Sequence, residues 1–280
     1  MNDDSRHNYE YEVDLHSDSA PARVIRMVGA DKSVLEIGAG PGSITKHLKL
    51  VGNCKVVALE IDEDAIPKLE PFCDAVYRAD LNDSTWPSLL DGAKFDTIVA
   101  ADVLEHVYDP WSTLEAMRRL LKDDGNIVIS LPHVGHSAVV ACLLDEDFDY
   151  RDWGLLDRTH IRFFGLKNMQ ALFNNAGLNI SEAQFVIVNP EDSEFAPRWK
   201  KLPLDVRKTL SSFRHGNIYQ VVIKAVPIAQ SADNIDLMSI PVDKVNSSGK
   251  ADIKSFLKIC VPAKYRANLR SLARKIGLNG

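Results

Sequence analysis

Short apolar runs alternate with amphipathic stretches along the first 225 residues of the chain. Runs that are rich in Val, Ile and Leu are typical of strands that a parallel sheet buries on both faces. We expect seven strands, near residues 34–38, 55–60, 75–79, 96–101, 126–131, 183–188 and 218–225. Helical patterns separate them, beginning with Ala20–Val28, which Asp18 or Ser19 would cap. The pattern therefore predicts an α/β fold with helices on both faces of a doubly wound sheet.

Three glycines follow the first apolar run, and an acid, Glu36, lies within that run. Gly38, Gly40 and Gly42 would let the backbone turn sharply and pass close to a ligand. Residues 44–50 read as a helix whose first amide groups face the same loop. A strand, a glycine loop and a helix predict a nucleotide site, but the spacing matches neither the G-x-G-x-x-G fingerprint nor a phosphate loop.

The E-x-G-x-G-x-G pattern of residues 36–42 resembles motif I of the class I S-adenosylmethionine-dependent methyltransferases. Segments 55–60, 75–81, 95–107 and 120–132 resemble further motifs of this family in the same order. The resemblance covers about residues 30–225. It implies a Rossmann-like, seven-stranded, mostly parallel sheet whose last strand is antiparallel. It also implies S-adenosyl-L-methionine as cofactor and S-adenosyl-L-homocysteine as product.

Acidic residues at strand ends are the next cofactor-binding candidates. Glu60 ends a strand about twenty residues after the glycines, a position from which a carboxylate bonds both ribose hydroxyls. By resemblance, Asp80 would bond the adenine amino group, and Asp102 would lie under the methionine part of the cofactor. The cofactor-binding residues that we expect are Glu36, Gly38, Ala39, Gly40, Gly42, Glu60, Ile61, Asp80, Leu81, Asp102 and Val103.

Two segments between strands are candidates for the substrate side. Residues 157–164 read D-x-T-H-x-R-F-F and resemble a methyltransferase subgroup found with glycosyltransferases in bacterial surface-polysaccharide synthesis. This resemblance suggests a sugar or saccharide hydroxyl as the methyl acceptor. The substrate-binding residues that we expect are Thr159, Arg162 and His133. Arg162 would clamp a phosphate or carboxylate, or would pair with Asp152 or Asp157. Residues 189–217 would form a flap over the substrate mouth or a solvated hairpin.

Methyl transfer from a sulfonium needs positioning rather than a protein nucleophile, and an alcohol acceptor also needs a base. Histidine is the natural base near neutral pH, and His160 and His106 are the candidates. The alternative is that His106 bonds a loop carbonyl and that His160 orders the substrate-side string. Asp102, Glu105 and His106 form a D-x-x-E-H pattern that would suit a divalent cation, although relatives without metal share these letters. We expect no metal.

Charge and composition narrow the class of partner. The chain has net charge −6, with −11 in residues 1–225 and +5 from Val226 to Gly280. An acidic body is a poor match for nucleic acid, so we expect a small-molecule or saccharide acceptor instead. The polar residues 1–10 are unlike a secretory signal, and no apolar run is long enough to cross a bilayer. Four scattered cysteines fit a cytoplasmic protein with reduced thiols.

The chain divides by composition into three parts: a methyltransferase domain at 1–225, a linker at 226–249 and a basic amphipathic segment at 250–280. Within the last part, residues 254–276 would lie on the inner face of an anionic membrane as a peripheral contact. Alternatively, this segment would dock on the acidic face of the domain or on a second subunit. The sequence predicts no oligomeric state.

These observations lead to an enzyme that transfers a methyl group from S-adenosylmethionine to an acceptor hydroxyl. One alternative is O-methylation of a small aromatic or quinone-like acceptor, with metal assistance. Another alternative is a non-catalytic cofactor-binding scaffold. An NAD-dependent oxidoreductase is disfavoured because the third glycine comes one position too early.

Overall fold

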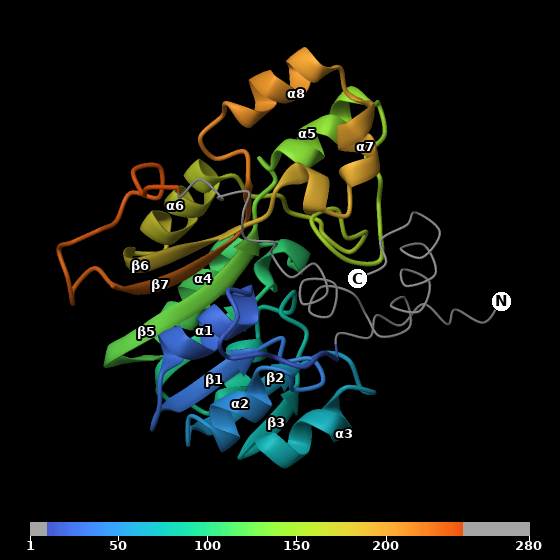
Figure 1. The fold of residues 1–280 in the computed structure, drawn as a ribbon. Helices are drawn as coiled ribbons and strands as arrows, with labels where there is room; N and C mark the ends of the chain where they lie inside the picture. The colour runs from blue at the N-terminus through green and yellow to red at the C-terminus, as the bar shows by residue number, and fades with distance from the viewer. Residues whose placement is uncertain (1–9, 243–280) are drawn as a thin grey trace.

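A computed structural model describes residues 10–242 of the chain, and the statements below concern those residues. One seven-stranded sheet forms the centre of the molecule, in the order β3-β2-β1-β4-β5-β7-β6 (Figure 1). The strands are β1 (Ser33–Ile37), β2 (Lys55–Glu60), β3 (Ala75–Arg78), β4 (Phe95–Ala101), β5 (Leu121–Pro132), β6 (Leu178–Ile187) and β7 (Ile218–Pro227). Strand β7 pairs antiparallel with both β5 and β6, and all other pairs of neighbouring strands are parallel. The sheet and its antiparallel last strand are thus confirmed.

The sheet buries both faces because side chains alternate along each strand. On one face, valines such as Val34, Val99 and Val128 pack against helix α1 (Ala20–Val28). On the other face, leucines and isoleucines such as Leu35 and Ile98 pack against two further helices. These helices are α4 (Pro110–Arg119) and α6 (Leu166–Asn175). The remaining α-helices are α2 (Thr45–Leu50), α3 (Ile66–Leu69), α5 (Ser137–Leu144), α7 (Ala196–Lys201) and α8 (Leu204–Ser211).

Local sequence explains where the helices begin. The Ser19 side chain accepts from the Ala22 amide at 3.4 Å and caps α1, as expected. Gly165 precedes α6 and has no side chain to cap it, so the Asn168 side chain accepts from the Gly165 amide instead, at 3.1 Å. Strand β6 begins at Leu178, earlier than predicted, because residues 178–182 pair with the end of β7.

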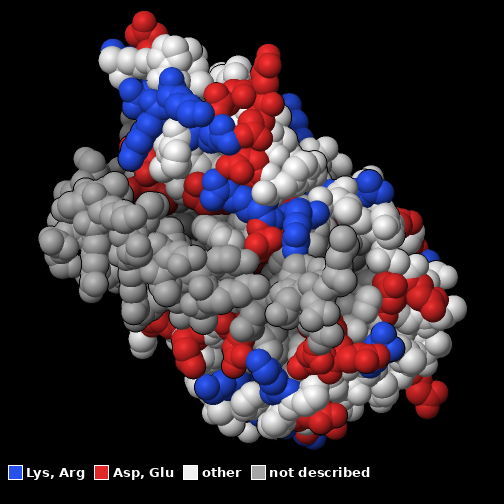
Figure 2. Space-filling model, turned by 90° about the vertical axis from the view of Figure 1, so that its right-hand side faces the viewer, with Lys and Arg blue, Asp and Glu red and all other residues white. Residues whose placement is uncertain are grey.

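Helices α5, α7 and α8 form a separate layer at one end of the sheet (Figure 1). Phe195 and Trp199 are buried in this layer, and Phe195 packs with residues of α5. Segment 189–217 is therefore neither a flap nor a hairpin, and none of its residues, all of which the structure describes, lines the pocket given below. Figure 2 shows basic side chains gathered at this end and acidic ones, with basic ones interspersed, over the rest of that face.

The first two residues of the predicted linker, 226 and 227, belong to strand β7, and residues 228–242, the rest of its described part, are attached to the domain. The Ile228 amide bonds the Gly177 carbonyl, and the Ile235 amide bonds the Ile180 carbonyl at 2.9 Å. Leu237 is fully buried in the core. This part does not act as a free linker, because its apolar residues pack beside α6 and β6. The rest of the linker and the basic segment 250–280 lie outside the described residues.

None of the helices between residues 10 and 242 has the length and hydropathy needed to cross a bilayer.

Candidate active site

A cavity of about 860 Å³ runs along the carboxyl ends of the parallel strands. It crosses the junction of β1 and β4, where the strand order reverses and where open α/β sheets bind their ligands. The loops after β1, β2, β3 and β4 line one part of it, and residues 152–160 with the start of β7 line the other. Of the predicted cofactor residues, every one except Gly42 lines this cavity.

The glycine loop is held close to the tip of β4. Gly38 has φ of +63°, and a Cβ there would lie 2.7 Å from Cγ2 of Val103. Only glycine fits such a backbone conformation at so close an approach. A Cβ on Gly40, by contrast, would meet nothing within 4 Å. Gly42 faces Leu69 instead of the cavity, so its role is to let the loop pack on α3.

Glu60 organises the loop that it was predicted to face. Its Oε2 accepts from the Gly40 amide at 2.5 Å, and its Oε1 accepts from the amides of Ile61 and Asp62. The carboxylate lies at the end of β2 and lines the cavity. The two amide bonds use both lone pairs of Oε1, whereas Oε2 keeps one lone pair with which it can accept from a ribose hydroxyl.

Glu36 is buried under the same loop. Its Oε2 accepts from the Thr45 hydroxyl at 2.6 Å. Burial raises the pKa of this carboxyl group to about 8, the Thr45 hydrogen bond opposes the rise, and the Glu60 charge adds to it. Glu36 is therefore largely protonated at neutral pH and can donate as well as accept a hydrogen bond.

Asp80 and Leu81 line the cavity at the end of β3, where the resemblance puts the adenine ring. The Asp80 carboxylate accepts from the Asn82 amide at 2.9 Å, which fixes the turn after the strand. Asn82 in turn accepts from the Tyr108 amide at 2.8 Å, so this turn is tied to the loop after β4.

Asp102 adopts a left-handed conformation, with φ of +55°, directly after β4. Its Oδ1 accepts from the Ser130 hydroxyl at 2.8 Å, and its Oδ2 accepts from the Gln220 amide at 2.9 Å. Burial raises the pKa of this carboxyl group against the effect of both bonds. Asp adopts this conformation more readily than most residues, and the bonds from β5 and β7 hold its side chain at the cavity.

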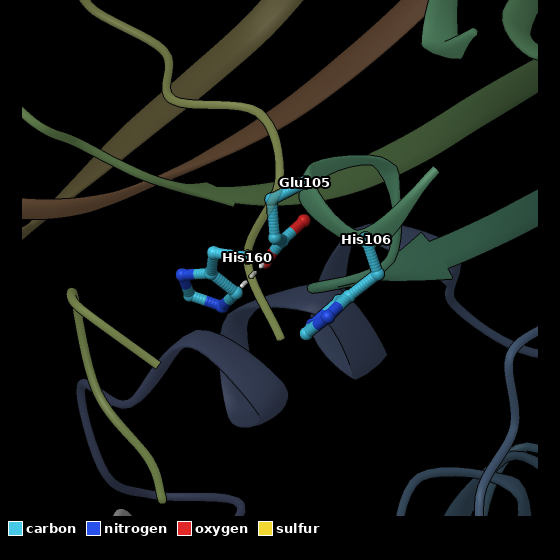
Figure 3. Close-up of side chains that lie close together, drawn as sticks. All are labelled: Glu105, His106 and His160. Atoms are coloured by element: carbon cyan, nitrogen blue, oxygen red, sulfur yellow. Dashed lines mark ion pairs between the residues drawn. The ribbon is translucent and has the colours of Figure 1, made fainter. Parts of the chain in front are cut away.

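Glu105, His106 and His160 lie together beside Asp102, with one donor atom of each within 4.8 Å of the others. Glu105 and His106 come from the short 3-10 helix after β4, and His160 comes from the substrate-side string. The Glu105 carbonyl accepts from the amides of Ile161 and Arg162, which joins the two segments. Figure 3 shows the Glu105 carboxyl group directed toward the space between the two rings.

The Glu105 carboxyl group is fully buried, and among the described residues neither of its oxygens has a hydrogen-bond partner. Burial, with the Asp102 charge, raises its pKa well above the ordinary value. Nε2 of His160 lies 3.9 Å from Oε1, which is within ion-pair range. Burial also lowers the pKa of His160 to about 4, so this imidazole is neutral at neutral pH and the contact is not an ion pair.

His106 is oriented by the substrate-side string. Its Nδ1 donates to the Thr159 carbonyl and to the Thr159 hydroxyl, at 3.2 and 3.0 Å. That hydroxyl donates its own proton to Asp157 at 2.7 Å. The Thr159–Asp157 pair therefore fixes the His106 tautomer with the proton on Nδ1, which makes Nε2 the basic nitrogen. His160 is fixed in the same way, because its Nδ1 donates to the Leu155 carbonyl.

Two predicted substrate-binding residues do not line the cavity. His133 is buried and its Nδ1 donates to the Ile218 carbonyl at 3.1 Å. The Arg162 guanidinium donates to the Tyr108 carbonyl and lies over the Trp111 ring. It contacts neither Asp152 nor Asp157 in the way that the sequence suggested. Each side chain donates to the backbone carbonyl of another segment and so holds a loop in place.

The sequence did not identify four residues that build the acceptor side. Trp153, Tyr219 and Gln220 line the cavity, and Glu194 lies behind it. Oε1 of Glu194 accepts from the Leu155 amide and from the Tyr219 hydroxyl, both at 2.9 Å. No local motif marks these residues, since their partners are distant in sequence.

The fold and the site together define a class I S-adenosylmethionine-dependent methyltransferase. A family model described as a methyltransferase domain matches residues 9–183, and the chain belongs to this family. A solved structure of a putative methyltransferase from Bacillus halodurans has the same fold, with a TM-score of 0.50 and 16% identity over 73% of this chain and 97% of that one.

Two relatives by sequence are named ubiquinone biosynthesis O-methyltransferase. The protein of Ruegeria sp. is 27% identical over 185 residues, 65% of this chain and 70% of the relative. The mitochondrial protein of Dictyostelium discoideum is 21% identical over 177 residues, 58% of this chain and 54% of the relative. The chain thus spans about half of one relative and more than two thirds of the other.

Proposed function

We propose that this methyltransferase acts on a hydroxyl oxygen of a small ring acceptor of the phenol or quinone-precursor type. The observation that carries the proposal is the oriented His106 imidazole in a cavity whose acceptor side has apolar surface between its carboxyl groups. Pro132, Trp153 and Leu155 contribute to that surface. The names of the Ruegeria and Dictyostelium relatives also favour a ring hydroxyl. A saccharide hydroxyl, suggested by the D-x-T-H-x-R-F-F string, is the competing acceptor.

The chemistry assigned to the chain is positioning and proton removal. Bound S-adenosylmethionine supplies a methyl group activated on sulfur. Nε2 of His106 would take the proton from the acceptor hydroxyl, while Thr159 and Asp157 keep Nδ1 protonated. His160 is a weak base, because burial lowers its pKa to about 4. His160 instead forms part of the wall beside His106.

Replacing His106 by Ala tests the base. With 4-methylcatechol as acceptor, kcat should fall by about 10²- to 10⁴-fold, the range expected for general-base catalysis. The affinity for S-adenosylhomocysteine should stay within about threefold, since the base acts on the acceptor. The matched control is His160→Ala, for which we expect a smaller fall. Undiminished turnover in His106→Ala would rule out the base, and methylation of a saccharide but not of the catechol would rule out the ring acceptor.

A second version of the mechanism uses a divalent cation, and the unpartnered Glu105 carboxyl group favours it. Glu105, His106 and His160 would hold the ion with one atom each, and both histidines donate their other nitrogen to a backbone carbonyl, as metal-bound histidines do. A bound cation would supply Lewis-acid stabilisation of a phenolate. Activity that a chelator removes and Mg²⁺, Mn²⁺ or Zn²⁺ restores would favour this version. Activity that survives exhaustive chelation would leave the base mechanism.

A further inference from the structure

The wall of the cavity is rich in carboxyl groups and poor in cations. Ten of its described residues are Asp or Glu, and Lys68 is the only Lys or Arg among them. The acidic residues are Glu10, Glu36, Glu60, Asp62, Asp64, Asp80, Asp102, Glu105, Asp152 and Asp157. Glu36 is largely protonated at neutral pH, but the ionised carboxylates among the others repel ligands of the same sign, more strongly where water is excluded.

Lys68, the single lysine of this wall, lies away from the acceptor side of the cavity. Lys68 lies on α3, and its Nζ pairs with Glu10 at 2.6 Å. Helix α3 follows β2, on the side of the sheet where Glu60 and Asp80 line the cavity. The charge of Lys68 is therefore neutralised within the wall, at the cofactor end.

The acceptor side keeps its acidic character. Asp102, Glu105, Asp152 and Asp157 line the cavity together with the histidine pair and Trp153. Arg158 pairs with Asp152 at 3.4 Å, but Arg158 itself does not line the cavity and its side chain is 43% exposed. No Lys or Arg among the described residues lines this side of the cavity, so an added anion would meet mainly carboxyl groups.

Arginine, the residue that proteins use to bind phosphate and carboxylate in a bidentate fork, is engaged elsewhere in this region. Arg162 donates to the Tyr108 carbonyl. Arg151 bonds Asp149 and lies over the Phe195 ring. No guanidinium of the described residues lines the cavity.

From this charge distribution we infer that the acceptor enters the cavity without a phosphate or a carboxylate and is either uncharged or cationic. The inference rests on the proposed hydroxyl methylation and narrows its substrate class. It excludes nucleotide-sugars, sugar phosphates and ring carboxylates as direct acceptors. It admits neutral phenols, catechols and their amine-bearing forms, whose apolar ring fits against Trp153, Leu155 and Tyr219.

Three catechols that differ in one substituent test the inference on the full-length enzyme. These are 4-methylcatechol, which is neutral, dopamine, which is cationic, and 3,4-dihydroxybenzoate, which is anionic. We expect kcat/KM for the anion to be at least tenfold below that of the neutral compound, and the cation to match or exceed the neutral compound. An anion that performs as well as the neutral compound would overturn the inference.

A pair of variants tests whether carboxylates of the cavity wall cause the difference in kcat/KM between the anionic and the neutral catechol. Asp152→Asn should raise kcat/KM for the anion relative to the neutral compound by about threefold or more. The control, Asp145→Asn, removes the same charge from a surface carboxylate that pairs with Arg198 and does not line the cavity. It should leave the ratio unchanged. Equal effects of the two variants would contradict a local cause.

Binding separates failure of this inference from failure of the proposed function. Each catechol is titrated calorimetrically into the enzyme saturated with S-adenosylhomocysteine. If no catechol is methylated but the neutral and cationic ones bind at least tenfold more tightly than the anion, the proposed reaction fails and the charge inference stands. If the neutral and cationic compounds do not bind, or bind no better than the anion, the charge inference fails.

Discussion

The buried carboxyl group of Glu36, under the glycine loop, should make the free energy of unfolding depend on pH. Its pKa is raised from 4.5 to about 8 by burial. Between these values the unfolded chain releases the proton and the folded chain keeps it, so the free energy of unfolding should fall as the pH rises. The slope can reach about 1.4 kcal/mol per pH unit and should vanish above about pH 8.

Urea unfolding of wild type and Glu36→Gln at several pH values between 5 and 9 measures this slope. The variant lacks the titrating group, so its stability should change less over that range. Glu70→Gln, at an exposed position, serves as the control and should follow wild type. Parallel curves for wild type and Glu36→Gln would contradict the raised pKa.

For single residues, the sequence predicted the position of a side chain where the residue ends a strand or directly follows one. Glu60, Asp80 and Asp102 line the cavity because a strand end fixes where they lie. Arg162 and His133 could not be placed, because their contacts with Tyr108 and Ile218 join segments that are more than 50 residues apart. A side chain with several rotatable bonds takes the partner that tertiary packing brings near, which no local pattern shows.

Among the elements, the loop at 152–160 depends on a side chain that lies just before α7, in the layer of α5, α7 and α8. Glu194 bonds Leu155 and Tyr219, and the Leu155 carbonyl accepts from His160. Gly154 has φ of +89°, and a Cβ there would lie 2.3 Å from Oε1 of Glu194. The close approach fixes the relative position of the loop and the layer. Glu194 is thus a positioning residue for the acceptor side.

Glu194→Ala should therefore raise KM for 4-methylcatechol by roughly tenfold, because it leaves the buried Leu155 amide and Tyr219 hydroxyl without their acceptor. Affinity for S-adenosylhomocysteine should not change. Glu194→Gln keeps an acceptor oxygen and should restore KM to within about threefold. Glu191→Ala, at an exposed position on the same segment, is the control. Equal loss of acceptor and cofactor affinity in Glu194→Ala would indicate general misfolding instead of positioning.

Helices and strands were predictable where their signals are local in sequence, and were not predictable where tertiary contacts decide the structure. Helix α1 matches its predicted range, because Ser19 and the apolar face are local signals. The helices of segment 189–217 were not predicted. They are short, and the burial of Phe195 and Trp199 against α5 stabilises them. Residues 228–242 pack on the domain by contacts of Ile235 and Leu237 that composition does not reveal.

At the scale of the whole molecule, the predicted sheet determines where the cofactor site lies. Seven apolar runs in order, with an acid after three of them, were sufficient to predict the sheet and the cofactor edge. The acceptor side was less predictable, since it is assembled from β7, the 152–160 loop and Glu194. Proteins that share this fold differ in function through their sites. The proposed function therefore depends on the claim that the carboxyl edge of the sheet binds S-adenosylmethionine.

Calorimetric titration of the full-length protein with S-adenosylhomocysteine tests that claim most directly, with Glu60→Ala as the site variant. Glu63→Ala is the matched control, since Glu63 lies three residues away, pairs with Arg78 and does not line the cavity. The account predicts one bound molecule per chain, affinity at least tenfold weaker in Glu60→Ala, unchanged affinity in Glu63→Ala and no comparable binding of NAD. Absent binding, tighter NAD binding or equal affinities in wild type and Glu60→Ala would contradict it.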